Sequence, residues 1–125
     1  MKPYIVPELA PASGPYCHAA RSGNLLFVSG QAPFNEKGEV VGADMAEQTA
    51  QTMKNLETVL SACGLALHDV VKTTVYLTNI DDFSAMNNVY AQFFNGHRPA
   101  RATVEAPRLA GGIRVEIEAV AEYAE

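Results

Sequence analysis

Two short segments near the C-terminus carry the side chains best suited to chemistry. Arg101, Thr103 and Glu105 occupy alternate positions of the first segment, and Glu116 and Glu118 do so in the second. An arginine offers a planar fork for a carboxylate, a threonine a hydroxyl, and a glutamate a base or a group that orients water. These residues could bind a small carboxylic acid and direct water at it, or they could form a charged face that meets only solvent.

Both segments alternate with the period of a β-strand. The apolar positions are Ala102, Val104 and Ala106 in the first segment, and Ile113, Val115, Ile117 and Ala119 in the second. Strands with one apolar and one charged face are typical of a sheet that is backed by helices on a single side. We therefore expect both apolar faces to lie under helices and both charged faces to lie on the other side of the sheet.

Earlier segments supply the elements that must position these two strands. They are a first strand entered near Tyr16, an apolar run at 25–29 ended by Gly30, a short strand at 40–41, a helix from Asp44 to Gly64, a strand at 69–78, and a helix capped by Asp81 and Asp82 and ended by Gly96. Acidic N-caps and terminal glycines set the limits of both helices. The order strand, strand, short strand, helix, strand, helix, strand, strand predicts an α+β sandwich, a mixed β-sheet with two helices on one face.

The composition predicts one globular domain, residues 1–125, and argues against nucleic acid as a partner. Of the residues, 48% are hydrophobic and 18% charged, and the formal net charge is −5. Four of the nine basic residues fall between positions 98 and 114, but acidic residues lie among them. Proteins that bind nucleic acid usually present a basic face, so we expect a mixed polar site rather than a track for phosphates.

The sequence lacks the patterns typical of membrane segments, signal peptides and metal sites. No apolar run approaches the roughly 18 residues of a membrane helix, and the N-terminus lacks the apolar stretch of a signal peptide. Cys17 and Cys63 form no metal-spaced cluster with His18, His68 or His97. We expect a cytoplasmic protein with free thiols, no membrane contact and no bound metal.

Several motifs resemble those of the Rid family (YjgF/YER057c/UK114), the reactive-intermediate deaminases. Pro99-Ala100-Arg101 followed by Val115-Glu116-Ile117-Glu118-Ala119 is similar to the family's C-terminal signature. The match extends upstream through Gly14-Pro15-Tyr16, Val28-Ser29-Gly30-Gln31, the strand at 71–77 and Tyr90-Ala91-Gln92-Phe93-Phe94. The resemblance implies a chorismate-mutase-like fold and a homotrimer, in which neighbouring subunits cover the bare sheet faces and the pockets lie at the three interfaces.

The same resemblance implies an activity. Rid proteins hydrolyse 2-imino acids and their enamine tautomers to 2-oxo acids and ammonia, and the imines arise from pyridoxal-phosphate enzymes such as threonine dehydratase. No cofactor is implied for this chain itself. Arg101 would anchor the substrate carboxylate and Glu116 would direct water, with Thr103 assisting the loss of ammonia. The remaining pocket residues implied by the family are Tyr16, Ser29, Gly30 and Asn87.

Two departures from the best-known deaminases leave the substrate open. Thr103 stands where those members have a cysteine, and the segment 95–98 is shorter, with Arg98 where an aromatic residue often sits. Short forms occur in catabolic members such as aminoacrylate and 2-aminomuconate deaminases, so a larger enamine is one alternative. A translation-inhibiting endoribonuclease is another, although the three histidines stand in unrelated sequence contexts. The third alternative is a non-catalytic trimer that binds small carboxylates or acts as a chaperone.

Overall fold

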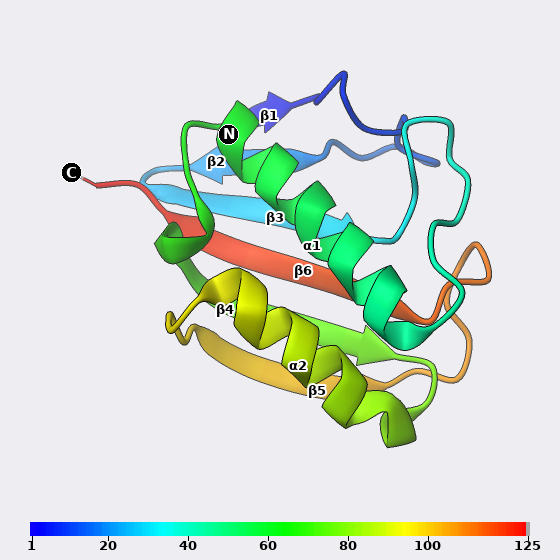
Figure 1. Ribbon diagram of the computed structural model, residues 1–125. Helices are drawn as coiled ribbons and strands as arrows, with labels where there is room; N and C mark the ends of the chain where they lie inside the picture. Colours follow the sequence, from blue (N-terminus) through cyan, green and yellow to red (C-terminus); the bar gives the residue numbers. More distant parts are fainter. Residues whose placement is uncertain (125) are drawn as a thin grey trace.

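The computed structural model describes residues 1–124, and its six strands form one mixed sheet with two helices on one face (Figure 1). The elements are β1 (Lys2–Tyr4), β2 (Ala19–Ser22), β3 (Leu25–Gln31), α1 (Met45–Ala62), β4 (Val70–Leu77), α2 (Phe83–Phe94), β5 (Ala100–Glu105) and β6 (Val115–Glu122). The strand order is β1-β2-β3-β6-β4-β5, and the β4–β5 pair is parallel while the other pairs are antiparallel. The predicted α+β architecture is confirmed. Glu125, the last residue of the predicted domain, lies outside the described residues.

Local signals in the sequence account for most element limits. The Asp44 side chain accepts a hydrogen bond from the Glu47 backbone N–H at 2.8 Å, which caps α1 as predicted. Helix α2 ends at Phe94, two residues before the predicted stop, and Asn95 and Gly96 follow with positive φ values of 47° and 92°. The predicted cap of α2 by Asp81 and Asp82 is wrong, because a 3₁₀ turn at Ile80–Asp82 precedes the helix and the Asp82 side chain makes no capping bond.

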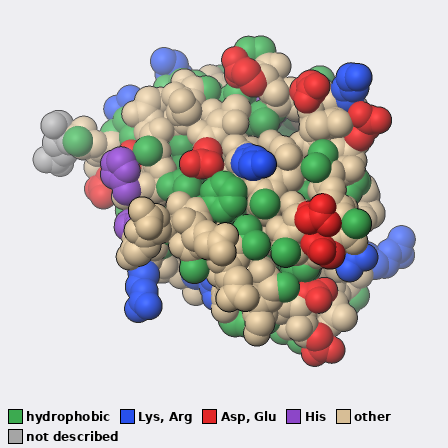
Figure 2. Space-filling model, viewed as in Figure 1, with side chains coloured by type: hydrophobic (Ala, Val, Ile, Leu, Met, Phe, Trp, Pro, Cys, Tyr) green, Lys and Arg blue, Asp and Glu red, His purple; other side chains and the backbone are tan. Residues whose placement is uncertain are grey.

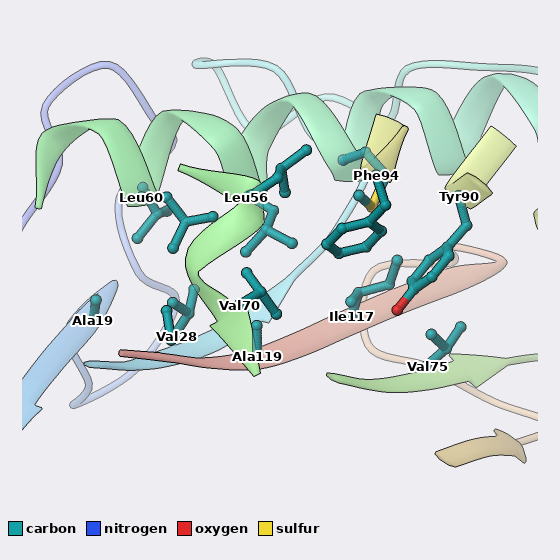
Figure 3. Packing of buried hydrophobic residues seen from close by; sticks show 14 of the residues in the cluster. Ala19, Val28, Leu56, Leu60, Val70, Val75, Tyr90, Phe94, Ile117 and Ala119 are labelled. Carbon is teal, nitrogen blue, oxygen red and sulfur yellow. The ribbon is translucent and has the colours of Figure 1, made fainter. Parts of the chain in front are cut away.

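The core lies between the helices and the sheet. Figure 3 shows Leu56 and Leu60 of α1 and Phe94 of α2 pointing at the sheet residues Val28 and Ile117. Each such side chain contributes about 1.5–3 kcal/mol through its removal from water. Met45, Met53 and Cys63 are buried in the same cluster, as expected for residues that fill space rather than bind a ligand.

Strand β6 matches the alternation expected from its sequence, whereas β5 does not. Val115 and Ile117 of β6 are fully buried, and Glu116 between them is directed to the face without helices. In β5 the guanidinium of Arg101 lies over the ring of Tyr90 from α2, 4.8 Å from its centroid, so Arg101 points to the helix side. Val104, expected under the helices, is 43% exposed on the other face.

The expectation that Arg101, Thr103 and Glu105 lie on the face without helices is therefore wrong. These residues are in register with Thr73, Val75 and Leu77 of β4, whose side chains are all buried under the helices. The physical reason is that β5 is an edge strand at the rim of the helix layer. There an arginine can cover an aromatic ring with its stem and face while its N–H groups stay accessible.

The helix-bearing face has no continuous basic surface. Figure 2 shows its Lys and Arg side chains as separate points interspersed with Asp and Glu. This pattern agrees with the expectation that a phosphate backbone is a poor partner for this face. Among residues 1–124, no helix is both long enough and apolar enough to cross a membrane.

Candidate active site

Glu116 is the acidic centre of a cavity of about 470 Å³ at the end of β3. Tyr16, Ser29 and Gly30 line the same cavity, so four of the predicted site residues lie together. A Cβ atom at Gly30 would collide with the Glu116 carboxylate, so a larger residue at this position would displace that carboxylate. The structure thus places backbone and carboxylate in direct contact at one wall of the cavity.

The electrostatic environment makes Glu116 a better base than an exposed glutamate. Burial raises the pKa of the Glu116 carboxyl, and the nearby Glu118 carboxylate raises it further. A carboxylate with a raised pKa holds a proton more readily at near-neutral pH. Glu118 itself accepts a hydrogen bond from the Tyr76 hydroxyl at 3.0 Å.

Two of the hydroxyl groups that line this cavity, those of Ser29 and Tyr16, differ in how firmly they are held. The Ser29 hydroxyl donates to the Cys17 carbonyl at 2.7 Å, which fixes its proton and leaves its oxygen free to accept. Tyr16 is 51% exposed, and its hydroxyl lies 3.3 Å from the Ser13 hydroxyl. Ser29 is therefore a fixed polar group, and Tyr16 is a rim residue open to whatever approaches this face.

Arg101 belongs to a different cavity, of about 510 Å³, between α2 and the start of β5. Its guanidinium stacks against Tyr90 and lies 5.5 Å from the ring centroid of Phe83. Asn87, predicted as a pocket residue, lines this cavity as well. Stacking holds the plane of the guanidinium and leaves N–H groups at its edge for an anion.

Tyr90 provides the support for Arg101. Its hydroxyl lies 2.7 Å from the Thr73 hydroxyl in the core. Burial raises the pKa of the Tyr90 phenol, while the Thr73 hydrogen bond and the Arg101 charge act in the opposite direction. The phenol therefore remains neutral at physiological pH, and the ring presents its face to the guanidinium.

The structure does not bring Arg101 and Glu116 together within one chain. Arg101 is in register with Thr73 on the helix side, and Glu116 pairs with Tyr76 on the opposite side of the sheet. Strand β4 lies between them, so their backbones are separated by about 10 Å across the sheet and about 10 Å along it. Thr103 shares the Arg101 side of β5 but lines neither cavity.

Sequence reasoning missed His18, which fixes the wall of the Glu116 cavity. Its Nδ1 accepts from the Val6 backbone N–H at 2.8 Å, and its Nε2 lies 3.0 Å from the Ala10 carbonyl. These two bonds require the neutral ring with the proton on Nε2. In the sequence, the available signal for a role of His18 at this cavity was its position two residues after Tyr16.

Asn55 was missed as well. Its amide donates to the carbonyls of Ala32 and Phe34 at 2.7 and 2.9 Å, and so ties helix α1 to the loop beside the cavity. A polar residue within the apolar stripe of the predicted helix was the available signal, because a buried amide needs partners.

The structure brings together two histidines that are unrelated in the sequence. His68 and His97, which stand in unrelated sequence contexts, line one cavity of about 420 Å³ together with Asp69 and Glu122. His97 Nε2 lies 2.7 Å from the Val70 carbonyl, and His68 pairs with Asp69 at 3.6 Å. No lysine or arginine lines this cavity among the residues that the structure describes. In the same part of the chain, no three His, Cys, Asp or Glu side chains are grouped to hold a metal ion.

Comparison with known proteins places this geometry in a family. Residues 7–123 match the family model described as Endoribonuclease L-PSP. This chain belongs to the Rid (YjgF/L-PSP) family. The predicted membership is confirmed. A RutC family protein of Pyrococcus horikoshii is 46% identical over 123 residues, covering 97% of this chain and 98% of the relative.

Two further Rid relatives are informative for function. A protein of Escherichia coli K12 named 2-iminobutanoate/2-iminopropanoate deaminase is 42% identical over 125 residues, covering 97% of this chain and 98% of that protein. The crystal structure of E. coli TdcF with bound serine has a TM-score of 0.93 at 34% identity, covering 99% of this chain and 100% of that one. This chain is thus similar along its whole length to a named imine deaminase.

Proposed function

We propose that this protein hydrolyses 2-imino acids to 2-oxo acids and ammonia, in a homotrimer whose sites combine the Arg101 cavity of one copy with the Glu116 cavity of its neighbour. The observation that carries the proposal is the division of the site. An arginine suited to binding a carboxylate and a glutamate with a raised pKa line two separate cavities, and their side chains are directed to opposite faces of one sheet. The similarity to a named imine deaminase supports the same reaction class.

A second copy of the chain is needed because the substrate is small. In a 2-imino acid the carboxylate carbon is bonded directly to the imine carbon, so the group that binds one and the group that acts on the other must lie within a few ångströms. Arg101 and Glu116 of one chain are too far apart for this. A closed ring of copies packed head to tail would bring one chain's Arg101 edge to the next chain's Glu116 face.

The uncovered sheet face supports this assembly. Phe27 of β3 and Val104 of β5 are 45% and 43% exposed, and both alternate with residues directed under the helices. Large apolar side chains on the bare side of a sheet favour burial against another protein surface. A second copy is the occupant that would also complete the site.

The reaction would proceed in three steps. Arg101 binds the substrate carboxylate through paired N–H donors and fixes the imine carbon. Glu116 accepts a proton from water as the water oxygen bonds to the carbon of the protonated imine, giving a neutral carbinolamine. Glu116 then returns this proton to the nitrogen and the carbon–nitrogen bond breaks. The hydroxyl proton passes to the departing ammonia, so ammonium leaves and the 2-oxo acid remains. Because the imine is already electrophilic, positioning supplies much of the acceleration.

The other predicted residues have supporting roles in this proposal. Ser29 and Gly30 form the wall behind Glu116, Tyr16 closes the rim, and Asn87 lies beside Arg101. Thr103, two residues after Arg101 on the same side of β5, would assist the departure of ammonia if the neighbouring copy extends the cavity to it. The imine substrates would be supplied by enzymes that eliminate water or a related group from amino acids through pyridoxal phosphate.

Cleavage of RNA is less well supported. The cavity with His68 and His97 offers two imidazoles, but its charged neighbours are Asp69 and Glu122. An RNA backbone would meet acidic side chains there, which oppose the binding of phosphates. Incubation of the protein with single-stranded RNA, with a His97→Ala variant as control, tests this alternative.

A coupled assay tests the proposed function. An amino-acid oxidase generates 2-iminopropanoate or 2-iminobutanoate, and the decay of the imine is followed with wild type, Arg101→Ala and Arg108→Ala. Arg108 is an exposed arginine that lines neither cavity and serves as the matched control. We expect wild type and Arg108→Ala to accelerate the decay, and Arg101→Ala to lose about 100-fold in kcat/KM.

Other outcomes point to the alternatives. Binding of 2-oxo acids without hydrolysis of either imine would indicate a larger enamine as substrate. The absence of both binding and hydrolysis would contradict the proposal and favour a non-catalytic trimer.

A further inference from the structure

The cavity that holds Arg101 carries a second cation. Arg98, in the loop between α2 and β5, lines the same space of about 510 Å³. The polar groups around it are neutral amides and an imidazole, and no aspartate or glutamate lines it among the described residues. In a chain with a formal net charge of −5, a cavity with two arginines and no acid is suited to an anion.

Neither arginine has an acidic partner within 4.0 Å among residues 1–124. In this part of the chain the salt bridge joins His68 and Asp69, neither of which lines this cavity. Arg101 is half-buried with its face against Tyr90, whereas Arg98 is exposed. The two positive charges therefore lie at different depths of one cavity, and a ligand with a single carboxylate would leave one of them unpaired.

We propose that Arg98 binds a second carboxylate, so that the preferred substrates are dicarboxylic 2-imino acids. Arg101 holds the carboxylate next to the imine carbon, and Arg98 holds the distal one. This inference rests on the proposed function for its reaction, in which water adds to the imine carbon and ammonia leaves while the distal carboxylate is unchanged. An apolar chain of the same length would lie against an unpaired guanidinium, which costs the hydration of that charge.

Paired substrates and paired variants test the inference. Amino-acid oxidases generate 2-iminoglutarate from glutamate and 2-iminohexanoate from norleucine, and hydrolysis is measured with wild type, Arg98→Ala, Arg98→Lys and Arg108→Ala. We expect wild type and Arg108→Ala to prefer 2-iminoglutarate by about tenfold in kcat/KM. Arg98→Ala should abolish the preference by slowing the dicarboxylic substrate alone, and Arg98→Lys should restore part of it. Equal loss on both substrates, or no loss on either, would overturn the inference.

A binding measurement separates this inference from the proposed function. Calorimetry with 2-oxoglutarate and 2-oxohexanoate reports affinity without any turnover. If Arg98→Ala weakens the binding of 2-oxoglutarate about tenfold and leaves the binding of 2-oxohexanoate unchanged, the dicarboxylate site is supported. This holds even if no imine is hydrolysed, in which case only the proposed reaction fails. If wild type hydrolyses imines but binds both ligands equally, the reaction stands and the role of Arg98 is overturned.

Discussion

Strands β5 and β6 carry the same alternating pattern of charged and apolar residues, yet they direct it to opposite sides of the sheet. Strand β6 lies between β3 and β4, so its apolar residues have no alternative to the core under the helices. Strand β5 pairs only with β4, and its apolar Val104 faces away from the helices while Arg101 lies against α2. Alternation therefore identifies a strand, but at a sheet edge it does not determine which face turns inward.

In the proposed function, this difference divides the site into two unlike halves. The Glu116 half is held by backbone, through Gly30 and through the loop fastened by His18. The Arg101 half is held by side chains, through the stack on Tyr90. Variants in the two halves should therefore fail in different ways, and the following predictions use that difference.

The largest effect is expected from Glu116→Gln. Glutamine keeps the size of the side chain but cannot accept the proton of the attacking water, so kcat should fall by about 100-fold or more. Binding of a 2-oxo acid should change little, because the anchor is Arg101. Steady-state kinetics with calorimetry measures both quantities, and a main loss in affinity would mean that Glu116 binds rather than acts as a base.

The raised pKa of Glu116 adds a dependence on pH. The active form is the carboxylate, so activity should fall as the pH drops through a pKa that lies above the usual glutamate value. Glu118→Gln removes the repelling charge and should shift this acid limb to lower pH. If the acid limb of the pH–activity profile does not move in Glu118→Gln, a group other than Glu116 is responsible for it.

The same shift has a consequence for stability. The folded state disfavours ionised Glu116, so protonated Glu116 contributes to the stability of the folded protein. This contribution is complete at pH values below the ordinary glutamate pKa and is lost as the pH rises through the raised pKa of the folded state. Glu116→Gln should therefore raise Tm at neutral pH and have little effect in acid. Thermal unfolding at both pH values measures this, and an equal change at both would contradict the assignment.

A smaller effect is expected in the Glu116 half from His18→Ala. The variant leaves the Val6 N–H and the Ala10 carbonyl without partners and should lower the free energy of unfolding by about 2 kcal/mol. His18→Gln, whose amide can both accept and donate, should recover part of the loss. Denaturant unfolding measures stability, and unchanged stability in His18→Ala would show that the ring does not fasten the loop.

The smallest effect is expected in the Arg101 half from Tyr90→Phe. The ring under Arg101 is kept, while the Thr73 hydroxyl loses its buried partner. Stability should fall by about 1 kcal/mol, and kcat/KM should change by about twofold or less. Tyr90→Leu removes the ring as well and should reduce affinity for 2-oxo acids. Equal affinity in both variants would mean that stacking does not orient the guanidinium.

The sequence predicted much of the fold because its signals are local. The capping of α1 by Asp44, the end of α2 just before Gly96 and the buried face of β6 follow from residues close to one another along the chain. The inward face of β5 depends on which strand it pairs with and where α2 crosses it, and neither is a local property. His18 acts through contacts 8 and 12 residues away, which the type of residue does not reveal.

The sequence gives candidate site residues by type, but it does not give their arrangement in space. The sequence indicated Arg101 and Glu116, and the motif resemblance added Tyr16, Ser29 and Gly30. Their grouping into two separate cavities required the three-dimensional structure.

The most direct test of the divided site is complementation between two inactive variants. Arg101→Ala and Glu116→Gln are co-expressed with different affinity tags, and assemblies that carry both tags are purified. If each site takes Arg101 from one copy and Glu116 from the next, every mixed trimer contains one intact site and should show about one third of the wild-type activity. If both residues act within the same chain, no intact site can form, and mixed assemblies as inactive as either variant alone would contradict the account.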